Sequence, residues 1–178
     1  MHGLVSLLPE PFYQQVEGIW QTLESEAGLH GIRVTPYPHF SWQIAEDYDL
    51  ERLQPIVERI ASQTRPFAVR TSGIGLFSGE QPVIYIALVK TLELMRFHSM
   101  VWDSILGTSS AASPYYSPGN WVPHISLAYG DVTIENIGKT MKNLAFQSYA
   151  WEMQIDNFAY IYEPQGTIGQ IRLRIPFA

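Results

Sequence analysis

One five-residue pattern occurs twice in this chain and constrains its fold more than any other feature. Residues 38–42 read Pro-His-Phe-Ser-Trp, and residues 123–127 read Pro-His-Ile-Ser-Leu. Polar and large apolar residues alternate after each proline, which is the period of a β-strand with one buried face. The histidine and the serine of each copy therefore share one face, and the two apolar residues share the other. We predict that the apolar residues Phe40, Trp42, Ile125 and Leu127 are buried.

The polar faces of the two predicted strands carry His39 with Ser41 and His124 with Ser126. Histidine titrates near neutral pH, so one imidazole can accept a proton while the other donates one. Serine hydroxyls can donate hydrogen bonds to phosphate oxygens, where charge develops in the transition state. These four residues are the predicted catalytic groups for work on a phosphate ester, and the sequence does not decide which histidine is the base. A serine nucleophile is disfavoured, because no Gly-x-Ser-x-Gly turn exists and His and Ser two positions apart on a strand are poorly aligned for activation.

These motifs resemble the two-histidine (2H) phosphoesterase superfamily, which contains the LigT-type 2′-5′ RNA ligases and related cyclic phosphodiesterases. The resemblance covers nearly the whole chain. It implies an α+β fold with duplicated lobes, each an antiparallel-rich sheet with helices outside, and an active cleft between them. It also implies a single domain over residues 1–178. The motifs depart from the family in using Ser where Thr is commoner, and Tyr129 and Gly130 stand where many relatives carry a basic residue. Substrate preference is therefore open.

Periodicity and turn residues give an order of elements in which strand, helix, histidine strand, helix and strand occur twice. Strands are predicted at about 3–8, 36–44, 67–77, 82–90, 121–130, 148–162 and 168–177. Helices are predicted from Pro11 to about 28, at 50–63, 92–106 and 134–145, and Pro55 suggests a later start for the second. His98 falls on the apolar stripe of the third helix, so we expect it to be packed and structural.

Composition limits the partners. The chain carries a net charge of −6 with only 11 Lys plus Arg, and shows no basic stripe of the kind that long nucleic acids need. We therefore expect a small nucleotide or an RNA end as substrate, no extended nucleic-acid surface and a monomer. The absence of cysteine excludes disulfides and thiolate chemistry. No signal peptide is recognised and the longest apolar run, 83–89, is too short to span a bilayer, so we expect a cytoplasmic protein with no membrane contact.

Four aromatic residues are candidates for stacking on a base: Tyr37, Phe77, Tyr115 and Tyr116. Tyr37 has the strand parity of His39, and the other three lie in segments expected near the cleft. Trp42 and Tyr129 have the opposite parity and are expected in the core. A cation that offsets phosphate charge is sought among Arg33, Arg70 and Lys90, and the sequence does not choose. No metal-ligand spacing is present, so neither a metal nor a cofactor is predicted.

The leading hypothesis is a metal-independent phosphoesterase that opens 2′,3′-cyclic phosphates, or cleaves or joins 2′-5′ linkages, in RNA or small nucleotides. One alternative has the same mechanism but acts on a non-RNA nucleotide metabolite, which the low basic content favours over long RNA. Another is a non-catalytic protein that binds nucleotides or RNA ends on the same fold. Intact His and Ser in both motifs argue against the binder, since binding needs no pair of proton-transfer groups.

Overall fold

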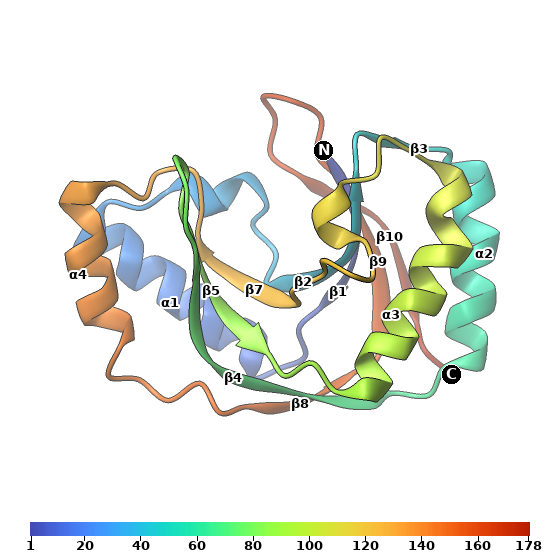
Figure 1. The fold of residues 1–178 in the computed structure, drawn as a ribbon, viewed down its shortest axis with the longest axis horizontal. Coiled ribbons are helices and arrows are strands. Elements are labelled where there is room, and N and C mark those ends of the chain that lie inside the picture. Colours follow the sequence, from blue (N-terminus) through green and yellow to red (C-terminus); the bar gives the residue numbers. More distant parts are fainter.

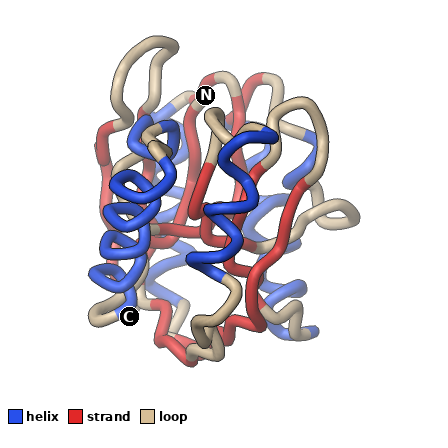
Figure 2. The backbone as a smooth tube through the Cα atoms, turned by 90° about the vertical axis from the view of Figure 1, so that its left-hand side faces the viewer, coloured by secondary structure: helices blue, strands red, loops and turns tan.

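Two four-stranded antiparallel sheets lie side by side in the middle of the molecule, with helices outside them, in the computed structural model of residues 1–178 (Figures 1 and 2). The helices are α1 (Phe12–Ala27), α2 (Leu50–Gln63), α3 (Leu92–Ile105) and α4 (Ile134–Leu144). The first sheet has the order β10-β9-β1-β2, from strands Gln170–Pro176, Asn157–Tyr162, His2–Leu7 and His39–Ala45. The second has the order β7-β5-β4-β8, from His124–Ala128, Val83–Leu88, Phe67–Phe77 and Glu152–Ile155. The predicted two-lobed α+β fold is therefore confirmed.

The lobes exchange helices. α1 lies between β1 and β2 in the sequence but packs on α4 and β7 of the second lobe (Figure 1). α3 lies between β5 and β7 but packs on α2 and β2 of the first lobe. A single cluster of 35 buried residues runs through both lobes, so they are packed against each other over a common core. None of the helices is long and apolar enough to cross a membrane.

The two motif strands meet where the lobes meet. β2 is the edge of the first sheet and β7 the edge of the second, and the two strands contact each other. The predicted alternation is confirmed, because the apolar residues of both motifs are fully buried: Phe40, Trp42, Ile125 and Leu127. With these side chains in the core, the opposite faces of β2 and β7 are left for the polar residues.

Short segments between the elements complete the frame. The 3-10 helices η1 (Gly31–Val34) and η3 (Pro114–Tyr116) each precede one motif strand but contact the other, η1 with β7 and η3 with β2. A two-stranded sheet joins β3 (Asp47–Tyr48) to β6 (Ser109–Ser110). η3 belongs to the long irregular stretch between α3 and β7, so this stretch is tied to the first lobe.

One predicted range is confirmed although a proline put it in question, and another is wrong. α2 spans Leu50–Gln63, the predicted range, and does not start later as Pro55 suggested; the Asp49 side chain caps it by accepting from the Arg52 N–H at 3.2 Å. The strand predicted at 148–162 is two strands, β8 and β9, that belong to different sheets. The break comes at Asp156, just before Asn157, whose side chain accepts from the Leu7 N–H and donates to the Leu7 carbonyl oxygen, both at 3.0 Å.

His98 is packed as predicted. Its ring is 1% exposed and stacks on Trp121 with 3.8 Å between centroids. Its Nε2 lies 3.0 Å from the Trp42 carbonyl oxygen, which joins α3 to the motif strand β2. It takes no part in the lining of the cavity described next.

Candidate active site

A cavity of about 760 Å³ opens between the lobes, and the polar residues of both motifs line it. His39 and Ser41 reach it from β2, and His124 and Ser126 from β7. Residues 85 positions apart in the sequence are thus placed around one volume, which is in the size range of small-molecule sites.

The two imidazoles are held in the same way. Nδ1 of His39 lies 2.5 Å from the Tyr37 carbonyl oxygen, and Nδ1 of His124 lies 2.7 Å from the Val122 carbonyl oxygen. A carbonyl can only accept, so each Nδ1 carries the proton and donates it. In the neutral ring Nε2 is then the unprotonated nitrogen, and it has no partner within the protein. Each histidine is therefore fixed in orientation and tautomer, with one basic nitrogen left for a ligand.

Burial favours the neutral form of both rings. Loss of hydration lowers the pKa of His39 to about 4, against the opposing effect of its bond to the Tyr37 carbonyl, and the neighbouring His124 lowers it further. Loss of hydration also lowers the pKa of His124. A bound anion has the opposite effect, because negative charge beside an imidazole favours its protonated form.

Two tryptophans hold the backbone of the motif strands. The Trp121 indole N–H donates to the Ser41 carbonyl oxygen at 2.9 Å, and the Trp20 indole N–H donates to the Ser126 carbonyl oxygen at 3.1 Å. Both carbonyls belong to edge strands, where backbone groups lack a strand partner on one side. The sequence does not indicate this role, because an indole among apolar residues is interpreted as core packing.

One serine has a hydroxyl neighbour from η3. Burial raises the pKa of Tyr116 to about 12, and a hydrogen bond with the Ser41 side chain partly offsets the effect. Tyr116 is therefore a neutral hydroxyl near neutral pH and can donate or accept beside Ser41. The corresponding segment beside the second motif, η1, presents Ile32 and Val34 to the cavity instead. The two halves of the site are consequently not equivalent.

Three of the four aromatic residues predicted to stack on a base line the cavity, and one does not. Phe77, Tyr115 and Tyr116 line the cavity, and the Phe77 ring stands at 86° to the His124 ring with 5.0 Å between centroids. Tyr37 does not line it, because β2 begins only at His39 and strand parity does not extend to residue 37. Its side chain packs instead against apolar residues of β1 and β9.

Tyr129 was expected in the core, and that expectation is wrong. β7 ends at Ala128, so the alternation stops before Tyr129, which is 40% exposed and lines the cavity. None of the three cations considered from the sequence (Arg33, Arg70 and Lys90) lines the cavity. No group of three or more His, Cys, Asp or Glu side chains gathers in a form that could hold a metal ion.

Comparison with known proteins agrees with this arrangement. The family model of the 2′-5′ RNA ligase superfamily matches residues 8–167. The chain belongs to this superfamily. In sequence it is similar to provisionally named phosphoesterases of Bacillus: one from Bacillus cereus is 24% identical over 119 residues, and one from Bacillus anthracis is 25% identical over 129 residues. The first match covers 67% of this chain and 64% of the relative, just under two thirds of its length, and the second covers 71% and 70%.

Several solved structures have the same fold as this chain. TT0787 of Thermus thermophilus superposes with a TM-score of 0.66 at 16% identity, over 99% of this chain and 97% of that one. LigT of E. coli, complexed with 3′-AMP, gives a TM-score of 0.59 at 13% identity with the same coverage. Usb1 of Kluyveromyces marxianus, with uridine monophosphate, gives 0.53 at 8% identity over 99% and 98% of the two chains.

Proposed function

We propose that this 2H protein is a metal-independent phosphoesterase that opens 2′,3′-cyclic phosphates or cleaves 2′-5′ phosphodiester bonds in RNA ends or small nucleotides. The observation that carries the proposal is the convergence of His39, Ser41, His124 and Ser126 on one cavity, with a free Nε2 on each imidazole. The named ligands of structural neighbours support a small nucleotide: 3′-AMP and ATP with LigT, and uridine monophosphate with Usb1.

The reaction needs two proton transfers. One imidazole takes a proton from the attacking water through Nε2 while the water oxygen bonds to phosphorus. The bond from phosphorus to the ribose oxygen breaks, and the second imidazole, charged at that moment, gives its Nε2 proton to that oxygen. The Ser41 and Ser126 hydroxyls, with Tyr116 beside the first, donate to the non-bridging oxygens that gain charge. Attack by a hydroxyl in place of water would run the same transfers toward ligation.

A substrate panel tests the proposal. The protein is incubated in EDTA with 2′,3′-cyclic nucleotides, RNA ended by a cyclic phosphate, 2′-5′ dinucleotides and ADP-ribose cyclic phosphate. Turnover of one of the first three, with loss of turnover in His39→Ala and His124→Ala, is the expected result. Turnover of the ADP-ribose compound alone would establish the non-RNA metabolite alternative. Binding without turnover would establish the non-catalytic binder, and activity that chelator abolishes and divalent metal restores would refute the two-histidine mechanism.

A further inference from the structure

Apart from histidines and tyrosines, the cavity is lined by only two groups that can carry a charge, and they lie together. They are the N-terminal ammonium of Met1 and the carboxylate of Glu163, and the ammonium donates to the Glu163 carbonyl oxygen at 2.9 Å. No lysine or arginine lines the cavity; its other titratable groups are three histidines and three tyrosines: His2, His39, His124, Tyr115, Tyr116 and Tyr129. Phosphate therefore finds no permanently cationic side chain in the lining of the cavity.

Glu163 is held in place by two further contacts. Its carboxylate accepts a hydrogen bond from the Thr35 hydroxyl, and its backbone N–H donates to Nδ1 of His2 at 2.9 Å. Because this Nδ1 accepts, its nitrogen carries no proton, and burial lowers the pKa of His2. The negative charge is therefore fixed at the cavity wall, and His2 adds no positive charge to balance it.

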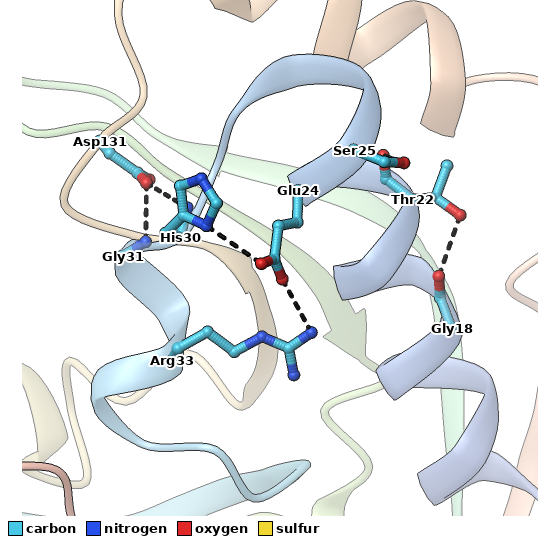
Figure 3. Close-up of polar contacts among 8 residues, drawn as sticks. All are labelled: Gly18, Thr22, Glu24, Ser25, His30, Gly31, Arg33 and Asp131. Carbon is cyan, nitrogen blue, oxygen red and sulfur yellow. Dashed lines mark hydrogen bonds and ion pairs between the residues drawn. The ribbon is translucent and has the colours of Figure 1, made fainter.

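The arginine nearest in sequence to the lining residues is turned away. Ile32 and Val34 line the cavity, but Arg33 between them binds Glu24, with 3.2 Å between Nη2 and Oε2 (Figure 3). Its guanidinium also lies 5.6 Å from the centre of the Trp20 ring. Reaching the cavity would cost Arg33 both contacts. At the other wall the residue after the second motif strand is the uncharged Tyr129.

The positive charge available to a ligand is therefore a single imidazolium of the motif pair. His39 and His124 line the same cavity, and charge on His124 lowers the pKa of His39, so protonation of one ring opposes protonation of the other. One imidazolium balances one negative charge. A second negative charge in a partly enclosed cavity has no partner and loses hydration without compensation.

From this charge balance, and resting on the proposed function, we infer that the cavity selects ligands with one negative charge, phosphodiesters, over phosphomonoesters and bisphosphates. Hydrolysis turns a diester into a monoester, which carries about −1.5 to −2 near pH 7. The product therefore binds more weakly than the substrate and leaves. Substrates with a second phosphate near the scissile bond are disfavoured for the same reason.

Three ligands without a 2′-hydroxyl test this by titration calorimetry at pH 7.5 in EDTA. They are the 3′-methylphosphate, the 3′-phosphate and the 3′,5′-bisphosphate of 2′-deoxyadenosine. We expect the affinity to fall by about tenfold from the diester to the monoester and again to the bisphosphate. Tyr129→Lys places a cation at the cavity wall and should reduce the difference in affinity between the diester and the monoester several-fold. Phe146→Lys is the matched control, because Phe146 is 91% exposed and does not line the cavity.

The outcomes separate this inference from the proposed function. Equal or tighter binding of the monoester or bisphosphate by the unmodified protein would overturn the charge selection, as would no measurable binding of the diester. The variant Glu163→Gln tests the charge selection independently. Loss of the negative charge should raise the affinity for the bisphosphate more than the affinity for the diester. The expected order of affinities without turnover of any cyclic phosphate or 2′-5′ linkage would refute the function and leave the charge selection standing. Turnover of a cyclic phosphate or a 2′-5′ linkage without the expected order of affinities would support the proposed function and refute the charge selection.

Discussion

His98 allows a pH effect on stability to be worked out from the structure. Its ring is enclosed between α3 and the core, stacked on Trp121 and bonded to the Trp42 carbonyl oxygen. Burial lowers its pKa from the ordinary 6.5 to about 4, against the opposing effect of the carbonyl. The folded protein therefore holds His98 neutral over a pH range in which the unfolded chain protonates it.

The sign and the size follow from proton linkage. Above pH 6.5 the ring is neutral in both states, so His98 gives no pH dependence there. As the pH falls from 6.5 toward 4 the unfolded chain gains the proton first, and the free energy of unfolding falls. With pKa values of about 4 and 6.5, the loss at pH 4.5 is about 2.5 kcal/mol, a large share of the stability of an ordinary domain.

The perturbation is His98→Phe, which keeps an aromatic ring against Trp121 and removes the titrating group. Urea unfolding of both proteins is followed by tryptophan fluorescence at pH 8 and at pH 4.5. The difference at pH 8 measures the cost of altered packing and of the lost hydrogen bond. From pH 8 to 4.5 the variant should lose about 2.5 kcal/mol less than the unmodified protein, because every other titrating group is common to both. Equal losses would refute the reasoning.

Four further outcomes are expected. His39→Ala and His124→Ala should each lower turnover by about 10² to 10⁴ while the circular dichroism spectrum stays unchanged, and normal activity in either would remove that histidine from the mechanism. Ser41→Ala and Ser126→Ala should lower the rate at every pH but keep both limbs of a bell-shaped profile, with Thr tolerated; a lost limb would contradict a hydroxyl that only binds phosphate. Trp42→Ala should reduce the free energy of unfolding by about 3–5 kcal/mol in denaturant titrations, since its indole is fully buried, and a loss under 1 kcal/mol would be inconsistent with that burial. Binding of a phosphodiester at pH 7 should take up about one proton, measured by calorimetry in buffers of different ionisation enthalpy, because the lowered imidazole pKa values leave the empty site neutral; no uptake would contradict the charge balance.

The parts of the fold that local periodicity controls could be predicted from the sequence. The alternation in residues 38–42 and 123–127 gave the correct buried faces, because one wrong step in a strand would place Trp42 in solvent. The break between β8 and β9 could not be predicted, because it depends on the hydrogen bonds of Asn157 with Leu7 of a distant strand. Tyr37 and Tyr129 were misplaced for another reason: both lie just outside a strand, where parity no longer applies.

The four motif residues that line the cavity could be predicted from the sequence, and the contacts that hold them could not. The motif residues can be recognised because their pattern occurs twice. The indole N–H groups of Trp20 and Trp121 donate to backbone carbonyl oxygens of the motif strands, and such contacts leave no pattern in the sequence. The ion pair of Arg33 could not be predicted from the sequence either. Its charge is visible in the sequence, and only the structure shows that Glu24 binds it.

The exchange of helices between the lobes limits how the site can move. The chain passes from one lobe to the other before and after α1, between α2 and β4, before and after α3, and again between β8 and β9 (Figure 1). Hinge closure of two lobes is easiest when few connecting segments join them. Here several connecting segments would have to bend together. The fold therefore fixes how far apart the two imidazoles lie before any ligand binds.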